Sequence, residues 1–228
     1  MSVTLKYFAF RGRALASRVA LFNALGKDGW KDERVSLPRF KKTIAPARLG
    51  PERVAAEYIT NNLPQLNLPC GTKVSQSHAI ARYAAALRPA EQPAHFVADL
   101  YPRDASQALV VDEAVAIVDQ ILLLTPKDAD EATRAQNRVA YQDTGFLRVG
   151  MEILEGRLKE SGGPFVLGQQ LTIADLYVRA PLCDLFELKQ FDGVGDEFVA
   201  DFPRVMACGA ATLAHPLLEA YHAAGYKN

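Results

Sequence analysis

The sequence predicts a small α/β domain with a mixed four-stranded sheet, followed by an all-helical bundle domain. Short β-rich runs alternate with helical patterns over residues 1–87, whereas the apolar patterns beyond residue 98 have helical spacing. Between them, residues 88–98 hold Pro89 and Pro93 and few apolar side chains, which is typical of a linker. The predicted domains are therefore 1–87 and 99–228.

The composition is that of an ordinary globular protein. Hydrophobic residues make up 49% of the 228 residues, and 26 basic residues balance 26 acidic ones. This balance leaves no net charge to attract nucleic acid or an anionic membrane, and we find no apolar run that would span a bilayer and no secretion signal. Cys70, Cys183 and Cys208 lack the spacing of a disulfide framework or zinc site, so we expect reduced thiols and no metal.

Within the α/β domain, a β-rich run at 3–8 precedes a helical pattern at 12–26, which Gly26 should end. The first β-α-β unit should be right-handed with parallel strands, and the later strand pair should be antiparallel. Residues 38–62 look irregular. The other predicted elements are strands at 30–37, 65–68 and 72–75 and a helix at 76–87.

The second domain shows helical patterns throughout. Apolar residues on one face mark a first helix that stops near Pro126, namely Val110, Ala114, Ile117, Val118 and Ile121. A second helical stretch should run from about Asp128 to Glu160, and shorter helices should follow Pro203 and Pro216. Thr172 and Asp175 form a capping-box pattern before a third helix, so we assign them a role in folding.

Three segments resemble one family: LKYFAFRGRALASR, NLPQLNLPCGTKVSQSHAIARY and FVLGQQLTIADLYV. Together they look like a cytosolic glutathione transferase and are most similar to the sigma-like, tyrosine-type classes. The resemblance covers essentially the whole chain. It implies a thioredoxin-like N-terminal domain, a cytoplasmic homodimer and a role in detoxification, with glutathione as co-substrate and no cofactor.

Tyr7 is the catalytic candidate. At the carboxyl end of the first strand, its phenol would point into the crevice where ligands of open α/β sheets bind. A thiol has a pKa of about 8.5 and a phenol one of about 10, so the phenol can stay protonated and donate a hydrogen bond that favours the thiolate. By resemblance, Tyr7 corresponds to the catalytic tyrosine of the family.

The resemblance also implies the glutathione-binding residues. Arg13 would support the tyrosine and the ligand, and Asn62 and Leu63 precede Pro64, which we expect to be cis. The backbone of Leu63 would then pair with the cysteinyl residue of glutathione. Gln76 and Ser77 would bind the γ-glutamyl group at a helix N-terminus, although a serine there can simply be a cap.

Three further binding residues follow less directly from the resemblance. Phe40 and Lys42 would bind the glycyl end, where sigma-like members usually have tryptophan instead of Phe40; a solvated basic turn is the alternative. The interval from Phe40 to Pro64 is longer than usual, with extra residues within APARLGPERVAAEY. Asp112 would reach the glutathione of the partner subunit, or be an ordinary solvated helix residue.

A small hydrophobic electrophile should lie over Tyr7, against Phe8, Val111 and Val115, although these apolar residues equally suit packing. The predicted reaction is attack of the thiolate on such an electrophile or on a hydroperoxide. The alternatives are a prostaglandin-type isomerase and a non-catalytic carrier or structural protein of the same fold. A cysteine-type thiol-disulfide reductase is disfavoured, because no cysteine lies between Tyr7 and Leu25.

Overall fold

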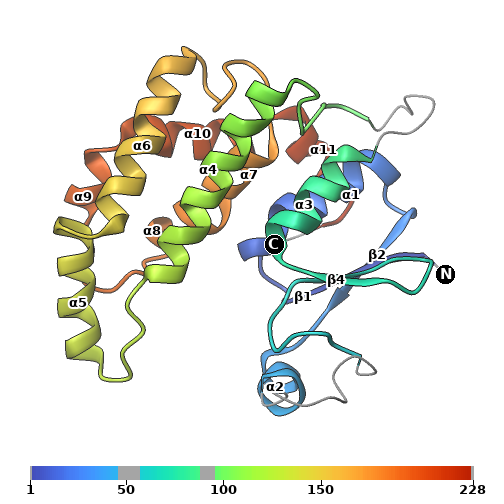
Figure 1. Cartoon of the computed structure of the whole chain (residues 1–228), viewed down its shortest axis with the longest axis horizontal. Helices are drawn as coiled ribbons and strands as arrows, with labels where there is room; N and C mark the ends of the chain where they lie inside the picture. Colours follow the sequence, from blue (N-terminus) through green and yellow to red (C-terminus); the bar gives the residue numbers. More distant parts are fainter. Residues whose placement is uncertain (1, 46–56, 88–95, 227–228) are drawn as a thin grey trace. The chain divides into compact units, whose positions relative to one another are not determined.

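The computed structural model describes residues 2–45, 57–87 and 96–226 of the chain. It divides into two compact units, Met1–Ala98 with Glu219–Asn228, and Asp99–Leu218. Figure 1 shows the elements of both. Parts of the expected irregular segment and of the expected linker lie outside the described residues.

The first unit contains the predicted mixed four-stranded sheet, in the order β2-β1-β3-β4. Strands β1 and β2 are parallel, and β3 pairs antiparallel with both β1 and β4. The fold class predicted for this half is therefore confirmed. The strands are β1 (Val3–Tyr7), β2 (Trp30–Arg34), β3 (Gln65–Asn67) and β4 (Lys73–Ser75).

Each of the four strands has one of its two ends at the same edge of the sheet. Tyr7 lies opposite Arg34 in the parallel pair, so both strands end at the same edge. Gln65 pairs with Lys6 and with Ser75, so β3 begins there and β4 ends there. The segments that follow Tyr7, Arg34 and Ser75, and the segment that precedes Gln65, therefore meet at this edge.

Helices α1 (Leu15–Leu25) and α3 (Ser77–Ala86) pack against each other beside the sheet (Figure 1). Residues 15–24 of α1 are all buried, and Gly26, with φ of 71°, ends the helix as predicted. The predicted strand at 30–37 ends earlier, at Arg34, and the segment expected to be irregular from residue 38 instead begins with α2 (Leu37–Arg39) and η2 (Phe40–Ile44). The side chain of Ser36 caps α2 and Pro38 lies in its first turn, a start signal that the sequence analysis missed.

The last residues of the chain, predicted to be part of the helical domain, belong to the first unit. The Tyr226 ring stacks on Tyr221 with a centroid distance of 4.8 Å and on Trp30 at 5.5 Å. The Tyr226 hydroxyl donates to the Lys27 carbonyl at 3.0 Å, and Tyr221 meets the edge of Phe22. Helical spacing reveals an apolar face but does not identify the surface that it covers.

We expect Tyr226→Ala to lower the free energy of unfolding by about 1 kcal/mol, because it removes a partly exposed aromatic stack. Urea denaturation measures this loss. Tyr83→Ala is the control, since the Tyr83 side chain is 39% exposed on α3. Equal effects of the two substitutions would show that the C-terminal stack contributes no stability.

The second unit is helical, as predicted. Its helices are α4 (Ala105–Leu124), α5 (Glu131–Asp143), α6 (Phe146–Ser161), α7 (Ile173–Tyr177), η4 (Val178–Cys183), α8 (Asp184–Glu187), α9 (Asp196–Ala200) and α10 (Pro203–Leu213). Helix α11 (Pro216–Ala223) begins in this unit and ends in the first. The expected starts after Thr172, Pro203 and Pro216 are confirmed.

The helical stretch expected from Asp128 to Glu160 is two helices, because the chain breaks between Asp143 and Phe146. Gly145 has an extended backbone there, and a Cβ on it would lie 2.6 Å from the Tyr141 ring. The Tyr141 hydroxyl in turn donates to the Ile121 carbonyl at 2.9 Å. The break therefore coincides with a close approach of Gly145 to Tyr141, four residues earlier, which the spacing of the apolar residues does not predict.

Thr172 and Asp175 form the predicted capping box at the start of α7. Both residues are fully buried. The Asp175 carboxylate accepts hydrogen bonds from the Thr172 N–H at 2.8 Å and from the Val166 N–H at 2.7 Å. The box therefore also ties the preceding loop to the helix.

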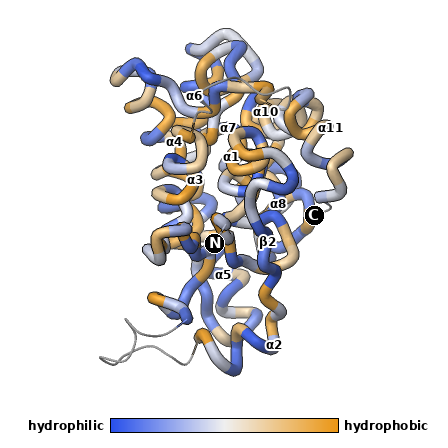
Figure 2. The backbone as a smooth tube through the Cα atoms, turned by 90° about the vertical axis from the view of Figure 1, so that its right-hand side faces the viewer, coloured by the Kyte–Doolittle hydropathy of each residue, from blue (hydrophilic) through white to orange (hydrophobic). Residues whose placement is uncertain are grey.

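Hydrophobic and hydrophilic stretches alternate along the chain in Figure 2. In the described residues, no helix combines the length and the apolar character needed to cross a membrane.

Candidate active site

Tyr7 is the last residue of β1, at the edge where the strand ends meet. The residue is only 4% exposed, and its hydroxyl oxygen accepts a hydrogen bond from the main-chain N–H of Arg13 at 3.1 Å. Because the oxygen is the acceptor in this bond, the hydroxyl proton is left to be donated elsewhere.

The electrostatic surroundings keep this phenol protonated. Burial raises the pKa of Tyr7 above its usual 10.0, while the Arg13 N–H bond and the charges of Arg13 and Arg18 lower it by less. The Arg18 guanidinium lies 5.6 Å from the centre of the tyrosine ring. At neutral pH, Tyr7 is therefore a neutral hydrogen-bond donor beside cations, a setting that favours a nearby anion.

Gly12 allows the chain to turn close to the tyrosine hydroxyl. Its φ is +41°, and a Cβ at this position would lie 2.7 Å from Tyr7 Oη and 2.8 Å from Phe10 Cε2. Both the backbone conformation and the space therefore require glycine here.

An aromatic cluster adjoins Tyr7 in the first unit. Phe8 and Phe10 are stacked 5.2 Å apart, and both meet the Tyr7 ring, at 5.1 and 5.6 Å. Phe40 contacts the edge of Phe8 at 5.0 Å. Thus Phe8 and Phe40, predicted for two different ligands, lie together, and Phe10, which is 49% exposed, is an addition that the sequence analysis missed.

The segment before β3 reaches the same edge. The Leu63–Pro64 bond is cis, which confirms the expectation from the sequence. The side chain of Gln65, only 1% exposed, accepts from the Ile59 N–H and donates to the Glu57 carbonyl, both at 2.9 Å. These bonds fasten residues 57–59, which precede Leu63, to the sheet.

Helix α3 starts where β4 ends. Gln76 is its N-cap residue, with φ of 80°, and Ser77 is its first helical residue. Ser77 is therefore not the N-cap, which was the alternative considered from the sequence. Ser77 is buried and Gln76 is exposed.

The residues expected at the glycyl end of the ligand are less closely grouped. Lys42 is exposed on η2, and Asn62 is exposed, with its N–H donating to Thr60 Oγ1 at 3.3 Å. Residues 46–56, within the long interval between Phe40 and Pro64, lie outside the described residues. The binding roles of Lys42 and Asn62 stay predictions.

The other predicted residues belong to the second unit. Asp112 is half-buried on α4, and its carboxylate accepts a hydrogen bond from the Tyr101 hydroxyl at 3.0 Å. Val111 and Val115 are buried, with exposures of 0% and 3%. Their contacts with a partner subunit's ligand or with an electrophile stay predictions.

Arg18, Asp32 and Arg34 are residues near Tyr7 that the sequence analysis did not select. Arg18 is fully buried and donates to the carbonyls of Phe8 and Phe10, at 2.7 and 2.8 Å. A sequence signal existed, because Arg18 is the one charged residue in the helix Leu15–Leu25. A buried guanidinium needs acceptors, so it marks a hydrogen-bonded position.

Within the described ranges, no group of three or more His, Cys, Asp and Glu side chains is arranged to hold a metal ion.

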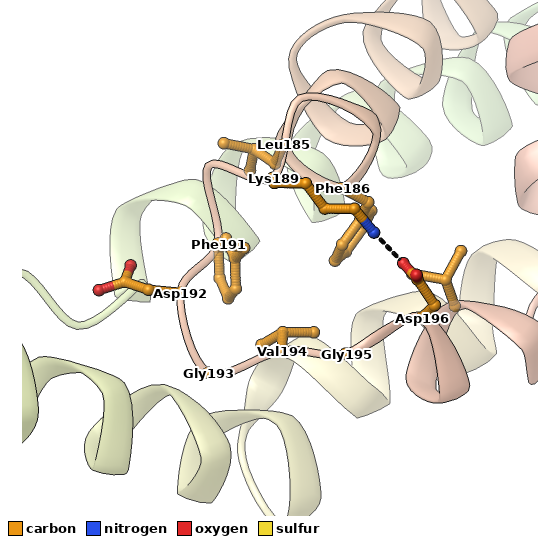
Figure 3. A pocket seen from close by; sticks show the side chains of 10 residues that line it. Leu185, Phe186, Lys189, Phe191, Asp192, Gly193, Val194, Gly195 and Asp196 are labelled. Atoms are coloured by element: carbon orange, nitrogen blue, oxygen red, sulfur yellow. Dashed lines mark hydrogen bonds and ion pairs between the residues drawn. The ribbon is translucent and has the colours of Figure 1, made fainter.

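A separate hollow of about 210 Å³ lies in the second unit, within the loop between α8 and α9 (Figure 3). Phe186, Phe191 and Val194 line it, and an ion pair joins Lys189 to Asp196. None of the predicted site residues lines this hollow.

Comparison with known proteins identifies the fold. Residues 121–225 match the family model described as glutathione S-transferase, C-terminal domain. S-crystallin SL11 of Nototodarus sloanii is 28% identical over 225 residues, covering 96% of this chain and 95% of that protein.

Two solved structures show the same architecture. Prostaglandin synthase D of Nilaparvata lugens superposes with a TM-score of 0.70 at 16% identity, covering 98% of both chains. A glutathione transferase homologue from sulfitobacter, with bound glutathione, gives a TM-score of 0.65 at 20% identity, covering 99% of both. The chain therefore has the glutathione-transferase fold, and residues 121–225 match the model of the glutathione S-transferase C-terminal domain.

Proposed function

We propose that this protein is a sigma-like, tyrosine-type glutathione transferase that activates the glutathione thiol with Tyr7. The thiolate attacks a small hydrophobic electrophile or a hydroperoxide, and glutathione is the co-substrate. The hydrogen bond from the Arg13 N–H to Tyr7 Oη at 3.1 Å carries the proposal, because it orients the phenol as a donor at the edge of the sheet.

The proposed chemistry requires the thiol of glutathione next to Tyr7. A free thiol with a pKa of about 8.5 is mostly protonated at neutral pH. A hydrogen bond from the phenol, together with the charges of Arg13 and Arg18, stabilises the thiolate, which is the nucleophile. The raised pKa of Tyr7 supports this role, since the phenol keeps its proton while the thiol loses its own.

The rest of the tripeptide fits the same edge. The backbone of Leu63, before cis-Pro64, supplies one antiparallel rung for the cysteinyl residue. The first turn of α3, at Ser77, offers N–H groups to the γ-glutamyl carboxylate, with Gln76 beside it. Phe40, Lys42 and Asn62 take the glycyl end, and Phe8 contacts the electrophile.

We also propose a cytoplasmic homodimer, in which Asp112 of the partner subunit contributes to each glutathione site. The resemblance of the chain to the transferase family supports this assembly. Gel filtration tests it, and a monomer would remove the role of Asp112.

The proposal predicts that Tyr7→Phe lowers kcat/KM for conjugation of glutathione to a chloronitrobenzene by about tenfold or more, which is about 1.4 kcal/mol of transition-state stabilisation. Removing one hydroxyl leaves the ring contacts in place, so glutathione binding should change little. Steady-state kinetics and calorimetry measure both effects. The control is Tyr83→Phe on α3, and equal activity of Tyr7→Phe and wild type would refute the role of Tyr7.

Two alternatives stay open because of the proteins that this chain is similar to. The S-crystallin similarity supports a non-catalytic protein, and the fold shared with prostaglandin synthase D supports an isomerase. A ligand that binds the folded state raises the melting temperature, so a transferase or isomerase should be stabilised by glutathione. Stabilisation without conjugation, but with turnover of a prostaglandin endoperoxide, would favour the isomerase; no stabilisation would favour the non-catalytic protein.

A further inference from the structure

The loop that follows Tyr7 is held by two arginines. Arg18 donates to the carbonyl of Phe8 at 2.7 Å and to that of Phe10 at 2.8 Å. Arg34 donates to the carbonyl between them, that of Ala9, at 2.9 Å. Three successive carbonyl groups are thus bound by guanidinium groups from α1 and from the end of β2.

One carboxylate orients both arginines. Asp32 Oδ1 accepts from Arg18 Nε at 3.1 Å, and Oδ2 accepts from Arg34 Nε at 3.0 Å. The side chain of Asp32 is 7% exposed and that of Arg18 is fully buried. Charge-assisted bonds in such a shielded place are stronger than those at a surface, and the planar guanidinium fixes their directions.

This loop determines where the hydrogen-bond partner of Tyr7 lies. The chain leaves the sheet after Tyr7, turns at Gly12, and returns so that the Arg13 N–H reaches the tyrosine hydroxyl at 3.1 Å. Any shift of residues 8–10 is passed to Arg13 through only two residues. The orientation of the phenolic O–H therefore depends on how firmly these carbonyls are held.

We infer that Arg18, Asp32 and Arg34 form a clamp on the loop 8–10 and act as positioning residues for thiol activation by Tyr7. The inference rests on the proposed function for its chemical consequence. Loosening the clamp lets the Arg13 N–H move away from Tyr7 Oη. The phenol then spends less time directed at the sulfur, so the pKa of the bound thiol rises.

The test compares Arg34→Gln and Arg18→Lys with Arg204→Gln. Arg34 is partly exposed, so its replacement should leave the fold intact, and Arg18→Lys keeps the charge but loses the planar fork. Arg204 is the control, because it is an exposed arginine that also pairs with a carboxylate, that of Glu155, in the second unit. Melting temperatures identify any variant that fails to fold.

Two measurements are made on each variant. Hydrogen exchange of the peptide covering residues 8–13 measures how often the loop opens. We expect exchange about tenfold faster in both clamp variants than in the wild type. The pH dependence of kcat at saturating glutathione measures the pKa of the bound glutathione thiol. We expect its pKa to rise by about half a unit, so that kcat falls near pH 6.5 and recovers at higher pH. Arg204→Gln should change neither.

The outcomes separate the clamp from the proposed function. Unchanged exchange at residues 8–13 in both variants would overturn the clamp. Faster exchange with an unchanged thiol pKa would overturn the positioning role, since general destabilisation lowers activity equally at every pH. Failure of the wild type to bind glutathione would instead refute the proposed function, while the exchange measurement would still decide whether the clamp holds the loop.

Discussion

Gly12→Ala is expected to reduce glutathione conjugation by about a hundredfold, since a small displacement of a catalytic group has an effect of this size. The added Cβ would lie 2.7 Å from Tyr7 Oη, closer than real contacts allow, so the hydroxyl or the loop must shift. Either shift breaks the geometry of the hydrogen bond from Arg13. Steady-state kinetics at saturating glutathione measures the loss in kcat.

Gly71→Ala provides the matched control for this substitution. Gly71 also has a positive φ, +92°, but a Cβ there meets nothing within 4 Å. It should therefore carry a similar backbone penalty of about 1 kcal/mol without touching the site. If the two variants lose stability alike but only Gly12→Ala loses activity, the contact with Tyr7 is responsible; equal activities would contradict the role of the close approach.

The second large effect concerns stability. We expect Asp175→Ala to lower the free energy of unfolding by about 3 kcal/mol, because it removes a helix cap and leaves two buried N–H groups without their acceptor. Those groups belong to Val166 and Thr172, whose hydroxyl also donates to Asp175 at 2.9 Å. For a chain of this size, the melting temperature should fall by about 10 °C.

Asp130→Ala is the control for this prediction, because Asp130 caps α5 through the Thr133 N–H at 2.8 Å but is exposed. Water replaces the lost carboxylate there, so the loss should be much smaller. Both variants are compared by calorimetry at pH 7.5. Burial raises the pKa of Asp175 to about 6, so the wild-type carboxyl is ionised at that pH. Similar losses of unfolding free energy in the two variants would show that burial of the Thr172–Asp175 capping box does not increase its contribution to stability.

Most of the fold follows from local patterns. The β-rich runs, the helical spacing of apolar residues and stops such as Gly26 predict the order of elements, because each depends on neighbours a few residues apart. The residues at the sheet edge were likewise predicted from motifs, and the structure brings Tyr7, Pro64 and Ser77 to that common edge. Their roles toward glutathione stay predictions.

The sequence by itself determined the two-part architecture, the capping box at Thr172 and the placement of Tyr7 at a strand end. Only the tertiary structure decided that Tyr226 stacks on Trp30 and that Arg18 reaches the carbonyls of Phe8 and Phe10. These features join residues from different elements. A periodic pattern shows which face of an element is buried, but the partner of that face is set by packing and hydrogen bonds that exist only once the chain has folded.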